Sequence, residues 1–216
     1  MEPIDISTAQ SHFSGGIMLS TRTVRLCQAV ATGPVRLLTH ALRQSLDLQL
    51  QTSDLKPEVT YVIIANHQSM LDPFMIMGSL SRPLWQRITP CRFFAHSGLF
   101  RNPIKRIILM GLGCFPTRAR GNLAYGLPAA EQLLAQNESV LIFPQGRRTR
   151  NQSELKPGIA HLASLPGVML IPVRLEWTKR AGIPRLNLVV GRPFSAAGNT
   201  APEIMEHVYT LPLKEL

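Results

Sequence analysis

The sequence predicts an α/β fold with a mixed, mainly parallel sheet that is flanked by helices and preceded by an N-terminal amphipathic helical segment. Short apolar runs rich in Val, Ile and Phe alternate with stretches that carry helix start and stop signals, which is typical of parallel sheets covered by helices. The chain has 216 residues, 45% of them hydrophobic, and is long enough to bury one core. We expect a flexible tail at residues 1–16, a basic amphipathic segment at 17–50 and one folded domain at 51–216.

The expected strands are short and rich in β-branched and aromatic residues. They cover residues 59–65, 91–95, 113–117, 139–143, 168–175 and 186–190. Helices are expected between them. Asn102 is a suitable cap for a helix that starts at Pro103 and stops at Gly111. Another helix is expected at about 127–136, and a further one starts at Pro73 with Asp72 as its cap.

The N-terminal segment is basic and has helical periodicity after Gly33-Pro34, which we expect to act as a break. Beyond this break the apolar residues recur at helical spacing, at Val35, Leu38, Ala41, Leu42 and Leu46. The other side of the helix carries Arg36, His40 and Arg43. Such a helix either packs its apolar stripe on the domain or lies in a membrane interface. Because the chain is basic, we expect residues 17–50 to dock on a membrane.

The chain contains 23 Lys and Arg against 13 Asp and Glu, which gives a net charge of +10. This balance indicates an anionic partner: a nucleic acid, an anionic membrane surface or a phosphorylated substrate. Only 6% of the residues are aromatic, and no helix-turn-helix, zinc-finger or RNA-binding strand pattern is visible. We therefore expect an anionic membrane surface and no nucleic acid among the partners.

The cysteines and the N-terminus indicate the compartment. Cys27, Cys91 and Cys114 are an odd number without a CxxC pair, which argues for a reducing compartment and against a zinc site. The N-terminus lacks the pattern of a secretory signal, and no apolar run is long enough to span a bilayer. We expect a peripheral membrane protein on the cytoplasmic face.

The most informative stretch is VTYVIIANHQSMLDPF at residues 59–74, where a buried strand ends just before His67. Proteins of the α/β class usually place their chemistry at such strand ends. Asp72 follows five residues later, and Pro73 disfavours helical angles before it, so a turn can bring the two side chains together. A carboxylate that holds one imidazole nitrogen leaves the other free as a general base. The alternative is that Asp72 only caps a helix.

Two further strand exits carry basic residues. The strand at 113–117 is followed by Arg118 and Arg120, and the strand at 139–143 by Gln145, Gly146, Arg147, Arg148 and Arg150. Neighbouring parallel strands end at the same edge of a sheet, so these groups can share one crevice with His67. Guanidinium groups bind phosphate oxygens in pairs, and a glycine lets the backbone approach a ligand. The alternative for the arginines alone is a solvated basic loop.

In these motifs the chain resembles the glycerolipid acyltransferase family typified by 1-acylglycerol-3-phosphate acyltransferase. Its HxxxxD block resembles NHQSMLD at 66–72, and the arginine that ends its second block falls on Arg118. Its FPEGTRS block resembles VLIFPQGRRTR at 140–150, and its proline-containing fourth block resembles LIPVRL at 170–175, which contains Pro172. The four blocks occur in the family's order, and the likeness covers about residues 61–194.

The resemblance implies that residues 51–216 are an acyltransferase domain. It implies that His67 deprotonates an acceptor hydroxyl while Asp72 orients the ring. The acyl donor is then acyl-CoA or acyl carrier protein, and the acceptor is a lysophospholipid or glycerol phosphate whose phosphate is held by Arg118 and Arg148. The implied substrate site also includes Gln145, Gly146, Arg147 and Pro172. No metal or redox cofactor is implied.

Two residues depart from the family pattern, since Gln145 replaces Glu and Arg147 replaces Thr. Gln keeps the shape of Glu but removes a charge and adds hydrogen-bond donors. This change favours either another acceptor, such as an amino-acid-derived lyso-lipid, or a weakened or non-catalytic phospholipid-binding relative. The presence of both His67 and Asp72 argues against a pure binding protein, which needs neither.

Overall fold

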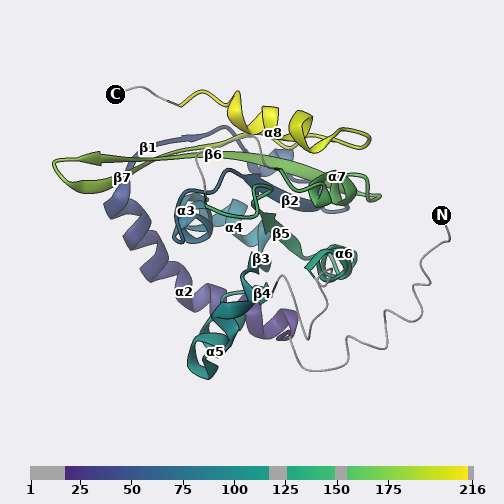
Figure 1. Cartoon of the computed structure of the whole chain (residues 1–216), viewed down its shortest axis with the longest axis horizontal. Helices are drawn as coiled ribbons and strands as arrows, with labels where there is room; N and C mark the ends of the chain where they lie inside the picture. The colour runs from purple at the N-terminus through teal and green to yellow at the C-terminus, as the bar shows by residue number, and fades with distance from the viewer. Residues whose placement is uncertain (1–17, 117–125, 149–154, 214–216) are drawn as a thin grey trace.

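The structure is a computed structural model that describes residues 18–116, 126–148 and 155–213. It confirms the predicted fold class, a mixed and mainly parallel sheet flanked by helices (Figure 1). Within these residues the sheet has seven strands in the order β1-β7-β6-β2-β5-β3-β4. The strands are β1 (Arg43–Leu48), β2 (Thr60–Ala65), β3 (Cys91–Ala95), β4 (Cys114–Pro116), β5 (Ser139–Ile142), β6 (Val168–Arg180) and β7 (Ile183–Val190).

Strand β2 lies at the centre of the sheet, parallel to β5 on one side and to β6 on the other. Strands β3 and β4 continue the parallel part beyond β5. Strands β6 and β7 form an antiparallel hairpin, and β1 pairs in parallel with β7 at the edge. Because β2, β5 and β3 run in the same direction, the residues that follow them meet at one edge of the sheet.

Helices cover both faces of the sheet. They are α2 (Thr21–Leu42), α3 (Asp72–Ser79), α4 (Arg82–Ile88), α5 (Pro103–Gly111), α6 (Gly126–Ala135), α7 (Gly158–Ala163) and α8 (Ala201–Tyr209), with the 3₁₀ helices η1 (Thr52–Asp54) and η2 (Ser97–Phe100). Helices α3 and α4 contribute to one hydrophobic cluster, whereas α6, α7 and α8 contribute to another.

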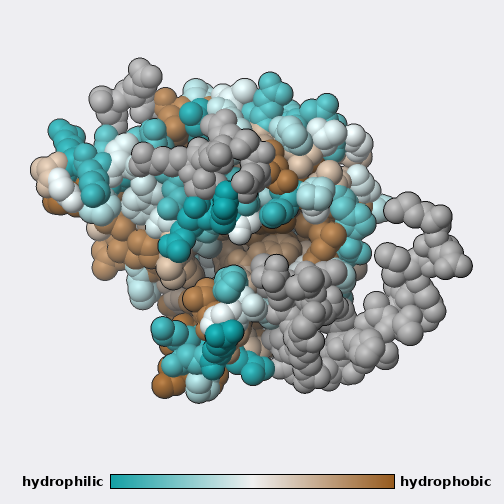
Figure 2. All heavy atoms as spheres, viewed as in Figure 1, coloured by the Kyte–Doolittle hydropathy of each residue, from teal (hydrophilic) through white to brown (hydrophobic). Residues whose placement is uncertain are grey.

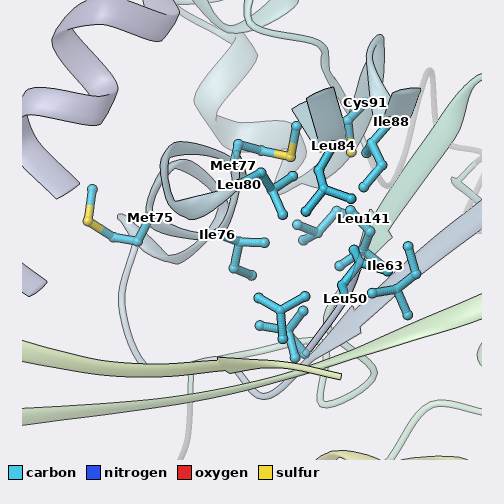
Figure 3. Packing of buried hydrophobic residues seen from close by; sticks show 14 of the residues in the cluster. Leu50, Ile63, Met75, Ile76, Met77, Leu80, Leu84, Ile88, Cys91 and Leu141 are labelled. Atoms are coloured by element: carbon cyan, nitrogen blue, oxygen red, sulfur yellow. The ribbon is translucent and has the colours of Figure 1, made fainter. Parts of the chain in front are cut away.

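The two faces of β2 explain this layering. Ile63 and Ala65 belong to the cluster with α3 and α4, whereas Val62 and Ile64 belong to the cluster with α6, α7 and α8. Alternate residues of a strand point to opposite faces, so a strand that is apolar at every position contributes to two cores. Figure 3 shows the first of these cores, into which α3 points Ile76.

Helix α2 differs from the prediction, because it runs through Gly33 and Pro34 without a break. A proline inside a helix costs about 3 kcal/mol, and tertiary packing offsets that cost here. Pro34 is exposed, so its ring displaces no packed neighbour. Further along, Thr39 is buried against α3, where a β-carbon on Gly78 would lie only 2.3 Å from Thr39 Oγ1. Glycine at position 78 therefore permits the close contact that holds α2 in place.

Residues Arg43–Leu48 form strand β1, and the prediction that the helical pattern continues to Leu46 is wrong. This strand pairs with β7, and Ser45 Oγ donates to Asn187 Oδ1 at 2.8 Å. Hydrogen bonds at the open edge of the sheet outweigh the helical periodicity, which is a tertiary effect that a local pattern does not contain. The expected helical segment at 17–50 is thus helical only as far as Leu42, and the expected tail at 1–16 lies outside the described residues.

The other expected elements are present with small shifts at their ends. Helix α5 starts at Pro103 and stops at Gly111, and Asn102 caps it by accepting from Lys105 N at 3.0 Å. Strand β6 is five residues longer than the expected 168–175 and ends at Arg180. Helices α4, α7 and α8 are not predicted by the sequence patterns.

Candidate active site

The segment after β2 is held against β6 by two side-chain amides. The backbone pairing of β2 with β6 ends at Ala65. Beyond it, Asn66 Oδ1 accepts from Leu175 N at 2.8 Å and Asn66 Nδ2 donates to Leu175 O at 2.7 Å. Gln68 continues the pattern, since its Oε1 accepts from Trp177 N at 3.1 Å. These bonds fix the turn between β2 and α3 on the sheet.

His67 and Asp72 meet across this turn, which confirms the predicted contact. Nδ1 of His67 lies 2.9 Å from Oδ2 of Asp72. The same oxygen accepts hydrogen bonds from the backbone N–H of Gln68 at 2.7 Å and of Ser69 at 2.8 Å. Asp72 is the first residue of α3 rather than its cap, and Pro73 follows in the first turn. The carboxylate therefore fixes the turn and holds the imidazole at the same time.

Trp177 contributes a contact that the sequence analysis missed. Its indole Nε1 donates to Oδ1 of Asp72 at 2.7 Å. The carboxylate has no exposed surface and takes part in four hydrogen bonds. A buried charge is tolerated when it is hydrogen-bonded in this way. Trp177 is 105 residues from Asp72, so no local motif links them. The sequence offers one clue to this contact, a tryptophan near the end of a strand. When such an indole is buried, its N–H needs a hydrogen-bond acceptor.

The imidazole of His67 uses one nitrogen for Asp72, and the other has no partner among the described residues. The ring stacks on Phe143, with centroids 4.1 Å apart and planes 20° apart, and 19% of the side chain is exposed. Contact with a carboxylate assigns the proton to Nδ1, which leaves the lone pair of Nε2 available. No residue in the described part of the chain hydrogen-bonds to Nε2. Such a nitrogen can take a proton from a bound group.

Gln145 is buried, with only 2% of its surface exposed. Its Oε1 accepts from the backbone N of His67 at 2.7 Å, and its Nε2 donates to the hydroxyl of Tyr209 at 3.2 Å. Burial raises the pKa of Tyr209, so this hydroxyl stays protonated at neutral pH. The resemblance places Gln145 in the substrate site, whereas these contacts show that it supports the backbone of His67. The sequence gives no signal for Tyr209, which comes from α8.

The turn after β5 presents two arginines. Gly146 N donates to Phe143 O at 2.9 Å, and Gly146 has a φ of 66°, a conformation that glycine adopts readily. Arg147 and Arg148 follow and are exposed. Strand β5 is parallel to β2 and adjacent to it, so the turn lies at the same edge of the sheet as His67. A contact of Arg147 and Arg148 with a phosphate stays a prediction. The other predicted arginines, Arg118, Arg120 and Arg150, lie outside the described residues.

Pro172 lies inside the sheet. It is buried in the middle of β6, opposite Ile64 of β2, and its carbonyl accepts from Gly191 N at 2.8 Å. A β-carbon on Gly191 would lie 2.9 Å from Cγ of Pro172, so the two residues are closely packed. The structure thus gives Pro172 a packing role in the sheet, and the substrate contact that the resemblance implies stays a prediction.

Two concave regions lie near these residues. Figure 2 shows a hollow with a hydrophobic floor in the middle of the face that Figure 1 views, between α3 and α6. A polar cavity of about 410 Å³ has walls that include Asn66, Gln68, Gln145, Trp177 and Tyr209. Among the described residues, no three His, Cys, Asp or Glu side chains gather as metal ligands.

The sheet, with a histidine–carboxylate pair at the end of its central strand, has the architecture of an α/β enzyme. The model of the family described as Acyltransferase matches residues 47–176, more than half of the chain, and the chain therefore belongs to the acyltransferase family. This result confirms the resemblance found in the sequence.

One solved structure extends the likeness to the whole fold. It is the crystal structure of the 1-acyl-sn-glycerophosphate (LPA) acyltransferase, PlsC, from Thermotoga maritima. The TM-score is 0.59, the match covers 94% of this chain and 84% of that chain, and the sequences are 17% identical. At this identity the likeness shows the fold alone. The sequence matches none of the curated proteins.

Proposed function

We propose that this acyltransferase moves a fatty acyl group from an acyl thioester to the free hydroxyl of a lysophospholipid, with 1-acylglycerol-3-phosphate as the first acceptor to test. The observation that carries the proposal is the pairing of His67 with the buried Asp72, which leaves Nε2 without a partner among the described residues. Family membership supports the reaction class. The name of the similar Thermotoga maritima enzyme, an LPA acyltransferase, supports the acceptor class.

In the proposed reaction, Nε2 of His67 removes the proton of the acceptor hydroxyl while the oxygen attacks the thioester carbonyl. The carboxylate of Asp72 stabilises the imidazolium that forms. The tetrahedral intermediate then collapses, the carbon–sulfur bond breaks, and the thiolate takes the proton from His67. An ester replaces a thioester, so the reaction needs no redox step. The proposal includes no metal or other cofactor.

The acceptor phosphate needs a cationic partner near the histidine. We assign this part to Arg148 together with Arg118, and Arg147 directly precedes Arg148 in the sequence. Arg148 is exposed at the edge of the sheet where His67 lies, and a guanidinium can bind two phosphate oxygens at once. The hydrophobic floor of the hollow in Figure 2 suits an acyl chain.

The acyl donor in this proposal is acyl-CoA or acyl carrier protein, and the acceptor lies in a membrane. We therefore propose a peripheral membrane protein that works on the cytoplasmic face. The odd number of cysteines, without a CxxC pair, supports a reducing compartment. In the part of the chain that the structure describes, no helix has both the length and the apolar character needed to cross a bilayer.

The experiment is an acyl-transfer assay with purified protein. It supplies lysophosphatidic acid with labelled acyl-CoA in one arm and labelled acyl carrier protein in the other, and it repeats both with His67→Ala. We expect phosphatidic acid from wild type in at least one arm and a rate at least about 100-fold lower in the variant. Equal rates in wild type and variant would show that His67 is not the base.

Failure of wild type in both arms would contradict the proposed acceptor. The next acceptor is then an amino-acid-derived lyso-lipid without phosphate, which the replacement of the family Glu by Gln145 suggests. The bond between Oε1 of Gln145 and the backbone N of His67 weakens that alternative, because this oxygen already has a partner in the protein. Binding of lysophospholipid without any turnover would favour the non-catalytic alternative.

A further inference from the structure

Helix α2 exposes several apolar residues, whereas two of its three buried residues, Gln28 and Thr39, are polar and the third is Val24. Leu26, Val30 and Leu37 are spaced by four and seven residues, so they form one stripe, and they are 68%, 73% and 73% exposed. Gln28, on the opposite side, is buried and donates through Nε2 to Cys91 O at 2.6 Å. A helix on the surface of a water-exposed protein has the reverse arrangement. The outer stripe of α2 is therefore suited to an apolar neighbour.

Helix α5 has the same character. Ile104, Ile107 and Ile108 lie on neighbouring turns and are 69%, 70% and 55% exposed. Lys105 and Arg106, which lie between them in sequence, are also exposed. Contiguous exposed apolar residues surrounded by polar ones mark surfaces that bind another protein or a membrane.

The two helices are neighbours. Gln28 Nε2 also donates to the carbonyl of Leu112, the residue after α5, at 3.0 Å. Gly111 ends α5 so close to α2 that a β-carbon on it would lie 3.4 Å from Sγ of Cys27. Figure 1 shows the N-terminal half of α2 beside α5. In Figure 2 hydrophobic atoms gather over α2, whereas the side of α5 that faces the viewer is mainly hydrophilic. The α2–α5 surface is defined here by Leu26, Val30, Leu37, Ile104, Ile107 and Ile108.

The charge around this surface has one sign. Residues 6–46 and 73–130, which contain α2 and α5, include none of the 13 Asp and Glu of the chain. The exposed Lys and Arg residues on or next to the two helices are Arg22, Arg25, Arg101, Lys105 and Arg106. A second copy of this chain would present the same cations to a symmetric contact, and like charges oppose such a contact. An anionic bilayer offers both the apolar phase and the opposite charge.

We propose that the α2–α5 surface lies in the headgroup region of an anionic membrane, with α5 as a second anchor beside α2. The isoleucines of α5 and the leucines of α2 enter the boundary with the acyl chains, while the surrounding cations contact lipid phosphates. This inference rests on the proposed function, because it explains how the enzyme reaches an acceptor that lies in a membrane. Vesicle binding can nevertheless be measured without any turnover.

The test of the apolar part compares two double variants of α5 by cosedimentation with phosphatidylglycerol–phosphatidylcholine vesicles. The pair Ile107→Gln and Ile108→Gln keeps helix-forming side chains but removes the apolar surface. We expect its affinity for vesicles to fall on the order of 100-fold. The matched pair Ile107→Leu and Ile108→Leu stays apolar, and its affinity should remain within about threefold of wild type.

A second pair of variants tests the charge. Lys105→Gln with Arg106→Gln should lower the affinity for anionic vesicles by about 30-fold. The control, Lys56→Gln with Arg192→Gln, removes the same net charge at exposed positions outside the α2–α5 surface and should have a much smaller effect. Equal losses in the two pairs would mean that only the net charge matters, which contradicts a defined docking face.

Other outcomes separate this inference from the proposed function. Wild-type vesicle affinity in the Ile107→Gln and Ile108→Gln protein, with an unchanged melting temperature, would overturn the inference. A wild-type dimer that this variant converts to a monomer would also overturn it, because the occupant would then be a second copy. Transfer to a dispersed short-chain acceptor should be unchanged in this variant. Vesicle binding without any transfer in wild type would count against the proposed function alone.

Discussion

The indole N–H of Trp177 donates to Oδ1 of Asp72 at 2.7 Å, on the carboxylate whose other oxygen contacts His67. Trp177 belongs to β6, and the same strand is fixed to the turn by Asn66 and Gln68. The position of the carboxylate thus depends on two neighbouring strands of the sheet. Asp72 cannot rotate away from His67 without losing the bond to the indole.

The first prediction concerns this bond. Trp177→Phe removes the N–H and leaves one oxygen of a buried carboxylate without its partner, so the free energy of unfolding should fall by about 1.5–3 kcal/mol. We also expect kcat to fall about tenfold with little change in KM, because the ring of His67 is less well oriented. The measurements are urea unfolding and steady-state kinetics. Trp85→Phe is the matched control, since Trp85 packs against the core from α4. Equal effects of the two substitutions on kcat would contradict a positioning role for Trp177.

The second prediction concerns the support of His67 by Gln145. Gln145→Leu leaves the partly buried N–H of His67 without its acceptor and should lower stability by about 1–3 kcal/mol. Gln145→Glu restores the family residue and keeps an acceptor, while the hydroxyl of Tyr209 can reverse its role and donate. We therefore expect this variant to retain the wild-type order of preference among acceptors. A switch in acceptor preference, measured on a panel of lyso-lipids, would show that Gln145 contacts the head group.

The third prediction tests the phosphate partner. Arg148→Gln removes a guanidinium proposed to bind the acceptor phosphate, so KM for lysophosphatidic acid should rise about tenfold or more. Transfer to an acceptor without phosphate should not change. Arg192→Gln is the control, because Arg192 is an exposed cation that follows the end of β7. Identical KM values for Arg148→Gln and Arg192→Gln would exclude a specific contact.

The fourth prediction concerns the thiols. Burial raises the pKa of Cys114 to about 12 and also raises the pKa of Cys91. Because the thiolate is the reactive form, neither should react with a disulfide reagent at pH 8 in the native protein. Cys27 is only partly buried and should react first. In denaturant all three should react, which is the control. Modification of Cys114 as fast as that of Cys27 would show that β4 opens in solution.

The sequence predicts the central part of the site well because its determinants are local. The apolar run of β2 ends next to His67, and Pro73 forces the turn that brings Asp72 back to the ring. All of these determinants lie within residues 60–73. The mainly parallel character of the sheet also follows from local patterns, since strands that alternate with helices are typical of such sheets. The order of the strands was not predicted, because it depends on pairings between distant segments such as β1 with β7.

The features that sequence analysis missed depend on residues far apart in the chain. Trp177 and Tyr209 reach the site from β6 and α8, and only the folded sheet brings them to Asp72 and Gln145. The segment Arg43–Leu48 has helical periodicity, but it becomes a strand because β7 offers it an edge. The outward direction of the apolar stripe of α2 was also not predicted. A periodic pattern shows that a helix has an apolar face, but it does not show whether that face points to the core or to the surface.

The central claim is that His67 and Asp72 act as one unit, and a double-mutant cycle on kcat/KM tests it most directly. The cycle compares wild type, His67→Ala, Asp72→Asn and the double variant in the same transfer assay. Because Asp72 acts only through the imidazole, we predict that the double variant is about as slow as His67→Ala alone. The account would be contradicted if the two losses in kcat/KM multiply. In that case Asp72→Asn would lower kcat/KM by the same factor in the His67→Ala protein as in wild type.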